Sequence, residues 1–347
     1  MNVRDLVRPH LLGIKAYSSA RDEYDGHEGV FLDANENPFD DAHDWNRYPD
    51  PYQRELKSAI ASVKEVGVEN IFIGLGSDEP IDLLIRAFCE PGKDGILILP
   101  PTYGMYKVSA DIQNVKVEEA LLRENFQLDL QVIERKLNKA TKIVFVCSPN
   151  NPTGNTMNRE DIEKLLEIAP GLVVVDEAYI DFTTEPSWTK SLEHHQNLVV
   201  LHTLSKAWGL ASIRLGMAFA NEQVIKMLNH IKPPYNVPGP VQQLALEAIN
   251  NHQDAKKSEV AHVLQERERL SPKLKELNGV LEVIPSETNF FLVRFENGKS
   301  VFDELINRKV VVRDRSKQPL CDGCLRLTIG TRAENDRLLT ELENILS

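Results

Sequence analysis

The sequence predicts an α/β protein whose large domain is built on an open, mainly parallel sheet. Short, continuous apolar runs alternate with helix-like segments between about residues 70 and 220. Runs of this kind are typical of strands that are covered by helices on both faces. We therefore expect strands and helices to alternate along this part of the chain in one layered domain. The predicted strands are residues 70–73, 95–99, 142–147, 172–175 and 198–202.

Helices are predicted where apolar residues recur at intervals of three and four positions. Residues 79–89 carry Ile81, Leu84 and Phe88 at this spacing, and residues 159–168 show the same pattern. Each of these segments lies between two predicted strands, as the connections of a parallel sheet require.

A proline-rich segment, residues 232–240, marks the approach to a second domain, because repeated prolines exclude a regular helix or a central strand. The elements predicted after it are a helical stretch over about 241–279, strands at 289–295 and 325–329, and a last helix at 334–346. We expect residues 45–235 to form the large domain. Residues 1–44 together with 236–347 are expected to form a smaller α/β domain.

Composition excludes several classes of protein. The chain has 347 residues, which suggests about two domains at ~150 residues each. Its formal charge is −12, because 40 Lys and Arg face 52 Asp and Glu. Basic proteins gain affinity for nucleic acids by releasing the counterions that surround the phosphates. So acidic a chain does not gain affinity in this way, which argues against general nucleic-acid binding. No apolar run approaches the ~18 residues of a membrane helix, and the N-terminus lacks the apolar core of an export signal.

The four cysteines indicate a reducing compartment, and we expect a cytoplasmic protein. Cys89 and Cys147 lie in apolar stretches, where a small buried thiol is the simplest interpretation. Cys321 and Cys324 form a single Cys-x-x-Cys pair with no second pair nearby, so we favour a turn over a zinc site, with a redox role as the alternative. No two histidines have the spacing of a catalytic metal site, and no metal is expected.

Three of the predicted strands lead into polar residues that could carry chemistry. The first leads to Asn151, the second ends at Asp176 and is followed by Tyr179, and the third leads to Ser205 and Lys206. Ligands bind at the carboxyl ends of strands in open parallel sheets. We therefore expect an amide, a carboxylate and an amine to meet in one crevice, although each residue alone could belong to a turn, a helix cap or a solvated surface.

Together these groups match the needs of one cofactor, pyridoxal 5'-phosphate. An amine holds its aldehyde as a Schiff base, and a carboxylate keeps its ring nitrogen protonated so that the ring can accept electrons. Hydrogen-bond donors complete the set by binding its phenolate oxygen.

Longer motifs resemble one family. Residues 203–216, with the sequence TLSKAWGLASIRLG, resemble the lysine signature of the fold-type I pyridoxal-phosphate aminotransferases, and residues 151–154 and 176–179 are similar to two other fingerprints of that family. The segments that narrow the resemblance to the histidinol-phosphate aminotransferases are residues 33–38, 46–51, 100–106 and 325–332. The resemblance spans nearly the whole chain. It implies a fold-type I enzyme with a large cofactor-binding domain and a small domain.

The resemblance also implies a role for each residue of the crevice. Lys206 would hold the cofactor and then, once the substrate amine displaces it, move the proton between the substrate Cα and the cofactor C4′. Asp176 would pair with the protonated ring nitrogen and stay ionised beside it. Tyr179 and Asn151 would donate to the ring oxygen, and a place in the core is the alternative for Tyr179.

The cofactor phosphate has a predicted site at a strand-to-helix turn. Gly76 lets the backbone approach an anion, and the N–H groups at the start of the next helix point toward it. Arg214 offers a planar fork that suits phosphate, whereas the Asp78 carboxylate would repel it, so we expect Asp78 to contribute backbone or to cap the loop. The predicted phosphate-binding residues are Gly76, Ser77, Asp78, Thr203, Ser205 and Arg214.

Two tyrosines complete the predicted cofactor site. Tyr103 follows two prolines and resembles the aromatic residue that stacks on the pyridine ring. Tyr48 resembles the tyrosine that reaches the phosphate from a neighbouring subunit, which implies a homodimer with shared active sites. Packing in a proline turn is the alternative for Tyr48.

Arginines and N-terminal segments are predicted to bind the substrate. Arg326 matches the family arginine that grips the substrate carboxylate, and its guanidinium fork can also bind a phosphate ester. Arg337 is a predicted second contact, with Arg332 as another candidate. Tyr17 and Asn35 match family segments that line the imidazole and phosphate subsite.

The resemblance implies ping-pong transamination between histidinol phosphate and 2-oxoglutarate, which gives imidazole-acetol phosphate and glutamate in histidine biosynthesis. Three alternatives stay open: an aromatic or branched-chain aminotransferase of the same branch, a lyase similar to the threonine-phosphate decarboxylases, and a cofactor-binding protein without activity. The intact Lys206, Asp176 and Tyr179 argue against the last, since binding alone needs no electron sink.

Overall fold

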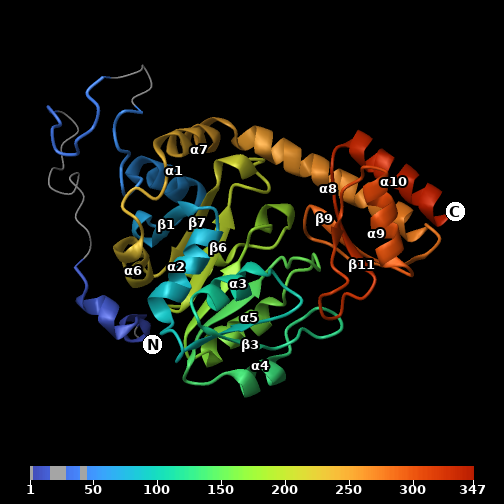
Figure 1. Cartoon of the computed structure of the whole chain (residues 1–347), viewed down its shortest axis with the longest axis horizontal. Helices are drawn as coiled ribbons and strands as arrows, with labels where there is room; N and C mark the ends of the chain where they lie inside the picture. Colours follow the sequence, from blue (N-terminus) through green and yellow to red (C-terminus); the bar gives the residue numbers. More distant parts are fainter. Residues whose placement is uncertain (1–2, 16–28, 40–44) are drawn as a thin grey trace.

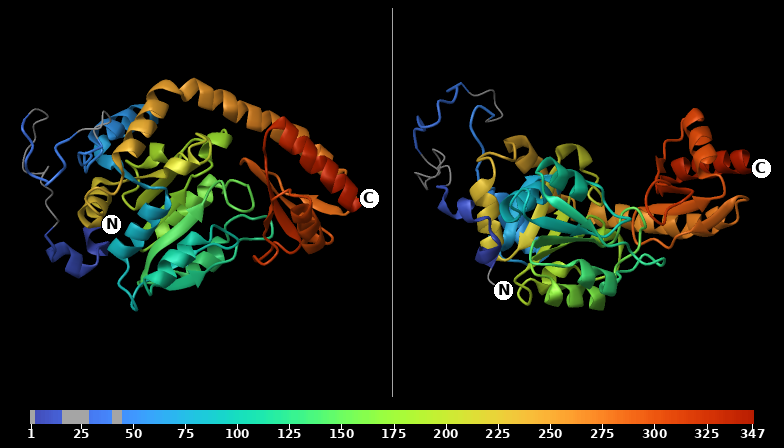
Figure 2. Two further views of the ribbon diagram at one scale, coloured as in Figure 1. Left: turned by 45° about the horizontal axis from the view of Figure 1, so that its top comes forward. Right: turned by 60° about the horizontal axis from the view of Figure 1, so that its bottom comes forward.

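The computed structural model describes residues 3–15, 29–39 and 45–347. A large unit built on a seven-stranded sheet carries a small unit built on a four-stranded sheet, and one long helix joins the two (Figure 1). The described N-terminal residues, 3–15 and 29–39, lie at the end of the molecule opposite to the small unit (Figures 1 and 2). None of the described helices is long and apolar enough to cross a membrane.

The large sheet is mainly parallel, as the sequence predicts. Its strands are β1 (Ile71–Leu75), β2 (Gly95–Ile98), β3 (Lys116–Glu119), β4 (Thr141–Cys147), β5 (Leu172–Asp176), β6 (Leu198–Thr203) and β7 (Leu215–Ala220). They lie in the order β1-β7-β6-β5-β4-β2-β3, and only β7 runs against its neighbours. The register of the parallel strands β4, β5 and β6 sets Cys147 beside Asp176 and Asp176 beside Leu201.

Helices cover both faces of the large sheet. They are α1 (Arg54–Lys64), α2 (Asp78–Phe88), α3 (Met105–Ile112), α4 (Leu130–Lys136), α5 (Arg159–Ile168), α6 (Glu222–Ile231) and α7 (Gly239–Asn251). Alternate residues of β5 show the burial on two sides. Val173 and Val175 belong to one apolar cluster with Leu56 of α1 and Ile249 of α7, whereas Val174 belongs to a second cluster with α2, α3 and α6.

The first described residues pack on the large unit, which differs from the predicted division into domains. Val3, Leu6 and Leu11 are buried in the cluster that contains α2, and the backbone N–H of Arg8 donates to the carbonyl of Ala87 at 3.0 Å.

The short 3-10 helices among the described residues are η1 (Val3–Leu6), η2 (Pro9–Gly13), η4 (Val68–Asn70), η5 (Ile180–Phe182), η6 (Trp188–Ser191) and η7 (Ala211–Ile213).

The small unit begins within the long helix α8 (Gln253–Lys275), later in the chain than predicted. Ala245 of α7 still packs in the core of the large unit, whereas Leu270 and Leu274 of α8 belong to the core of the small unit. The helical stretch predicted as continuous is two helices that meet at His252.

The small sheet is antiparallel, in the order β10-β11-β9-β8. The elements of the small unit are β8 (Val280–Val283), β9 (Phe290–Phe295), α9 (Gly298–Asn307), β10 (Arg313–Asp314), β11 (Cys324–Thr328) and α10 (Arg332–Leu346). The pairing of β10 with β11 sets Arg313 opposite Arg326. A capping box between Thr331 and Glu334 begins α10.

The small unit contacts the large unit beside the carboxyl ends of the parallel strands. The Glu287 N–H donates to the carbonyl of Gly154 at 2.7 Å, and Arg326 Nη1 donates to Asn151 Oδ1 at 2.6 Å. Ile284 of the small unit also belongs to an apolar cluster of the large sheet. Side chains from both units therefore meet at the strand ends.

Candidate active site

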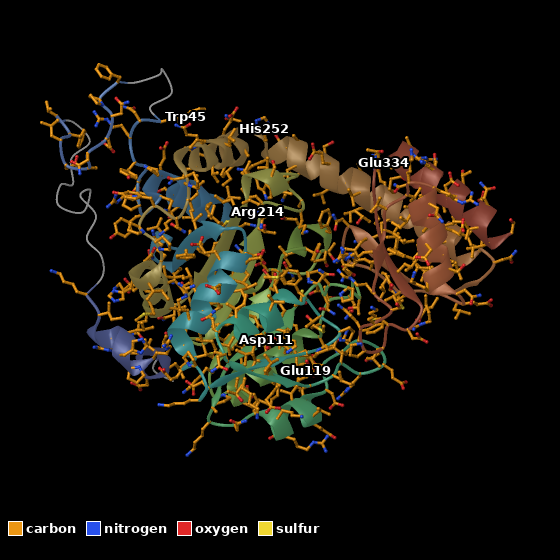
Figure 3. The ribbon with its side chains drawn as sticks, in the orientation of Figure 1. Trp45, Asp111, Glu119, Arg214, His252 and Glu334 are labelled. Carbon is orange, nitrogen blue, oxygen red and sulfur yellow. The ribbon has the colours of Figure 1, made fainter. Side chains whose placement is uncertain are left out.

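A cavity of about 380 Å³ lies where the two units meet. It contains most of the residues predicted to bind the cofactor, and Arg214 lies in the middle of the large unit in Figure 3. The predicted residues in its walls are Ser77, Asp78, Tyr103, Asn151, Asp176, Tyr179, Thr203, Ser205, Lys206, Arg214 and Arg326.

Lys206 lies in the turn after β6, and it lines the cavity. Its Nζ is 5.6 Å from the centroid of the Tyr179 ring. Burial lowers the pKa of Lys206, and the Arg326 guanidinium lowers that pKa further, while Asp176 opposes both effects. An amine that gives up its proton more readily is a better nucleophile and a better base near neutral pH.

Asp176 ends β5 and is almost completely buried. Burial raises the pKa of its carboxyl to about 6, although hydrogen bonds from the Tyr106 hydroxyl (2.6 Å) and the Ala178 N–H (3.1 Å) favour the ionised form. A cationic group in the cavity would stabilise the carboxylate further. The sequence gives no sign of this role for Tyr106, because a tyrosine whose hydroxyl faces Asp176 follows the same apolar pattern as any core tyrosine.

The turn between β1 and α2 lies against the loop that carries Arg214. Gly76 has φ +72°, and its N–H donates to the Arg214 carbonyl at 2.8 Å. Arg214 Nη1 donates to Ser205 Oγ at 3.3 Å, and Nη2 lies 3.6 Å from the Asp78 carboxylate. Asp78 also accepts a hydrogen bond from the Tyr103 hydroxyl at 3.0 Å. The side chain of Asp78 thus contacts Arg214 and Tyr103, a role that the sequence did not indicate.

These residues fit pyridoxal phosphate. The first turn of α2 and the Arg214 fork can bind a phosphate. A methyl group at position 76 would stand 2.5 Å from Arg214 Nη2, so glycine is what leaves the arginine in place. At the other side of the cavity, Lys206 can bind the aldehyde and Asp176 can pair with the ring nitrogen. Thr203 supports the phosphate end, since its hydroxyl lies 3.0 Å from Ser205 Oγ.

Tyr179 and Asn151, the predicted donors to the ring oxygen, are both buried in the cavity wall. The Tyr179 ring meets Phe290 edge-on, with centroids 5.2 Å apart, so this tyrosine also packs in an apolar cluster. Burial raises the pKa of the Tyr179 hydroxyl, which therefore stays a donor at neutral pH. The side-chain oxygen of Asn151 accepts from Arg326, which leaves its NH₂ group as the donor.

Arginines of the small unit form a cationic wall that the sequence predicts only in part. Arg313 and Arg315 line the cavity together with Arg326. Burial lowers the pKa of Arg315, and Arg326 and Arg313 lower it further. Among the described residues, the main ionisable neighbours of Arg315 and Arg326 are arginines, tyrosines and a cysteine rather than carboxylates. No strand pattern marks these arginines in the sequence, because β10 spans only Arg313–Asp314 and Arg315 follows it.

The structure corrects the prediction for Arg337. This residue lies on α10, and its guanidinium donates to the backbone carbonyl of Arg308 at 3.0 Å, away from the cavity. Arg332, the other candidate, pairs with Glu266 and Asp336. Figure 3 shows the start of α10, marked by Glu334, well apart from Arg214.

Asn35 and Tyr48, the predicted N-terminal residues that the structure describes, do not line the Lys206 cavity of their own chain either. Asn35 is exposed and lines a separate cavity of about 860 Å³ together with Tyr48. The Tyr48 ring stacks on Tyr235, with centroids 4.5 Å apart. Tyr17 lies outside the described residues. A contact of Tyr48 with a cofactor phosphate therefore requires a second copy of the chain.

The Cys-x-x-Cys pair forms the turn that the sequence predicts, with the Cys324 N–H donating to the Cys321 carbonyl at 2.9 Å. Both thiols are buried, and neither forms a disulfide. Within the part of the chain that the structure describes, no three His, Cys, Asp or Glu side chains form a metal-binding group.

Comparison with known proteins assigns this fold and cavity to a family. The model of the family "Aminotransferase class I and II" matches residues 22–342. The chain belongs to the class I and II aminotransferases. Curated relatives of this aminotransferase include the histidinol-phosphate aminotransferase of Cytophaga hutchinsonii, which is 52% identical over 97% of each chain, and that of Christiangramia forsetii, which is 49% identical over 99% of each chain.

Solved structures share the fold of this aminotransferase. The histidinol-phosphate aminotransferase of Clostridium acetobutylicum superposes with a TM-score of 0.81 at 25% identity, covering 88% of this chain and 92% of its own. That of Sinorhizobium meliloti, in complex with pyridoxal 5'-phosphate, gives 0.80 at 22% identity, over 88% and 84% of the two chains. The L-threonine-O-3-phosphate decarboxylase of Porphyromonas gingivalis gives 0.75 at 23% identity, over 88% and 92%. The predicted fold-type I architecture is confirmed.

Proposed function

We propose that this pyridoxal-phosphate-dependent aminotransferase transfers the amino group of histidinol phosphate to 2-oxoglutarate, in histidine biosynthesis. The products are imidazole-acetol phosphate and glutamate. The observation that carries the proposal is a single cavity with Lys206 and Asp176 on one side and three arginines on the other. Relatives that are 49–52% identical over nearly the full chain are histidinol-phosphate aminotransferases, which supports the same substrate here.

The residues of the large unit suit the cofactor's chemistry. When bound, pyridoxal phosphate supplies an aldehyde that takes up the donor's amino group and a ring that draws electrons from the donor's Cα. Lys206 binds the aldehyde and, once released from it, acts as the base that moves a proton from Cα. Asp176 keeps the ring nitrogen positively charged, while Tyr179 and Asn151 donate hydrogen bonds to the ring oxygen.

The residues of the small unit suit anionic substrates. Arg326, Arg313 and Arg315 bring three guanidinium groups into the cavity. The planar fork of a guanidinium matches the paired oxygens of a phosphate ester and those of a carboxylate. The same arginines can therefore bind histidinol phosphate and 2-oxoglutarate in turn, which is what a ping-pong reaction requires.

We further propose that the enzyme is a cytoplasmic homodimer. Val30, Leu32 and Phe39 are more than 80% exposed, and such apolar side chains along one segment are suited to contact a second chain. Tyr48 lies outside the Lys206 cavity of its own chain, which supports its predicted role in the partner's site. All four cysteines are free thiols, which supports a reducing compartment.

A panel of half-reactions tests the proposed substrate. The purified holoenzyme is mixed in turn with histidinol phosphate, glutamate, phenylalanine and leucine, and conversion of the cofactor from its aldehyde to its amine form is followed by absorbance. We expect histidinol phosphate and glutamate to react fastest. A clear preference for phenylalanine would show an aromatic aminotransferase instead, and no absorbance change with any donor would show a binding protein.

A second measurement distinguishes transfer from decarboxylation. The enzyme is incubated with threonine phosphate, and carbon dioxide is measured. In parallel, it is incubated with histidinol phosphate and 2-oxoglutarate, and the ketone imidazole-acetol phosphate is measured. We expect the ketone from histidinol phosphate and no carbon dioxide from threonine phosphate. Carbon dioxide release without ketone formation would identify a lyase.

A further inference from the structure

Tyr106 and Asp176 form a buried pair at the base of the cavity. Tyr106, on α3, is completely buried, and its hydroxyl donates to Asp176 Oδ2 at 2.6 Å. The Tyr106 ring stacks on Phe145, with centroids 4.5 Å apart and planes 9° apart. Tyr103 meets the same ring edge-on, with centroids 5.5 Å apart. These contacts leave the hydroxyl little freedom to turn away from the carboxylate.

The second oxygen of Asp176 is also held. Oδ1 accepts the N–H of Ala178 at 3.1 Å, so two different elements hold the two carboxylate oxygens. An ionised carboxylate has about four acceptor positions, and these two donors leave room for a third. Because Asp176 lines the cavity, the remaining capacity is available to a cationic group inside it.

We propose that Tyr106 is a positioning residue, which holds the Asp176 carboxylate as an oriented anion for the protonated ring nitrogen of the cofactor. The inference rests on the cofactor named above and not on the identity of the substrate. Tyr106 acts through Asp176 and does not line the cavity itself. Its effect should therefore depend entirely on the presence of the carboxylate.

The direction of the electrostatic effect follows from the surroundings of Asp176. Burial raises the pKa of Asp176 to about 6, and the hydrogen bonds from Tyr106 and Ala178 lower it. Burial, and then Asp176 itself, raises the pKa of the Tyr106 hydroxyl far above neutral, so Tyr106 stays the donor. Asp78 and Lys206 also affect the pKa of Asp176, in opposite directions. In addition to burial, Asp176 in turn raises the pKa values of Tyr103, Cys147 and Tyr179. Loss of the Tyr106 hydroxyl therefore raises the pKa of Asp176 and leaves less anion near pH 6 to 7.

The experiment compares Tyr106→Phe with wild type and with the control Tyr52→Phe, which removes a hydroxyl from a tyrosine outside the cavity. Apoenzyme is titrated with pyridoxal phosphate between pH 5.5 and 8.5, and binding is followed by quenching of protein fluorescence. Wild-type affinity should fall as the pH drops through about 6. In Tyr106→Phe the midpoint should move to higher pH, and affinity near pH 6.5 should fall about tenfold, as expected for a hydrogen bond to a charged group. Tyr52→Phe should match wild type.

A double-mutant cycle separates positioning from simple packing. Tyr106→Phe is combined with Asp176→Asn, which removes the charge and keeps the shape. We expect Tyr106→Phe to cause no further loss of cofactor affinity, and no shift of midpoint, in the Asp176→Asn background. Thermal unfolding of each apoenzyme reports any loss of folding directly.

Two results would overturn the inference. The first is a uniform loss of affinity in Tyr106→Phe with an unchanged midpoint, which a packing role would give. The second is an equal loss in the presence and absence of the Asp176 carboxylate. A wild-type protein that binds no pyridoxal phosphate at any pH would overturn the proposed function as well, whereas slow turnover of histidinol phosphate alone would leave this inference intact.

Discussion

Gly76→Ala tests the phosphate end of the cavity most directly. Alanine at φ +72° costs about 1–2 kcal/mol, because its Cβ crowds the backbone in the left-handed region. The new methyl would also stand 2.5 Å from Arg214 Nη2, so the guanidinium must move. A charge-assisted hydrogen bond is worth about 1.5–3 kcal/mol. Displacing Arg214 from the phosphate should therefore weaken cofactor binding roughly 10- to 150-fold.

Gly92→Ala is a matched control for the backbone strain. Gly92 has φ +73°, and a methyl group there would meet only Asn114 Nδ2 at 3.7 Å, an ordinary contact. Both variants should lose a similar 1–2 kcal/mol of unfolding free energy, measured by denaturant titration of the apoenzymes. Only Gly76→Ala should lose affinity for pyridoxal phosphate in a fluorescence titration. If Gly76→Ala bound the cofactor as tightly as Gly92→Ala, the assignment of Arg214 to the phosphate would be refuted.

Three further predictions concern other parts of the molecule. Arg315→Gln should raise the Kd of histidinol phosphate roughly tenfold in a competition assay, because a hydrogen bond to a charged group is lost. The Kd of dephosphorylated histidinol should not change. An equal change for both ligands would contradict the assignment of Arg315 to the substrate phosphate. Glu266→Gln should lower the free energy of unfolding by about 2 kcal/mol, because the buried carboxylate accepts bonds from Arg269 and two neighbours. These hydrogen bonds, chiefly the one from Arg269, lower the pKa of Glu266 to about 2. The contribution of Glu266 to the free energy of unfolding is therefore complete above about pH 4.5 and is lost as the pH falls toward 2. A stability difference between Glu266→Gln and wild type that stayed constant from about pH 7 to pH 3 would contradict this explanation. Lys206→Ala should abolish turnover and leave the melting temperature of the apoenzyme nearly unchanged, and substantial activity would remove its catalytic assignment.

The central strands could be predicted because their local sequence is almost entirely apolar, as expected for buried strands. β4, β5 and β6 are continuous runs of mostly β-branched and apolar residues, buried along nearly their whole length, and their predicted bounds agree to within one residue. β3 was missed because it is an edge strand with the sequence KVEE, whose charges suit a solvent-facing edge. β7 was missed because LGMAFA has neither alternation nor β-branched residues, and its place between β1 and β6 depends on distant pairing.

The division into units could not be predicted as well, because local signals mark loops and not packing partners. The prolines of residues 232–240 do form the predicted break before α7. They do not decide which unit α7 packs on, and Ala245 and Ile249 pack on the large sheet. The same holds for Val3, which is buried in the apolar cluster that contains α2, more than seventy residues away in the chain.

At the site, too, local sequence does not show how the two units pack against each other. For this reason the cofactor could be inferred in more detail than the substrate. Asp176 ends one strand of the large sheet, and Asn151 and Lys206 follow two others, so the order of strands alone brings the three together. The substrate side depends instead on how the small unit lies against those strand ends, and the bond from Arg326 to Asn151 is a direct link between the two sides. A change that shifted the small unit would move Arg313, Arg315 and Arg326 away from Lys206 and leave the cofactor residues, Arg214 included, in place. Affinity for pyridoxal phosphate and selectivity for the amino donor are therefore expected to respond to different sets of substitutions, the first in the large unit and the second at the junction of the two.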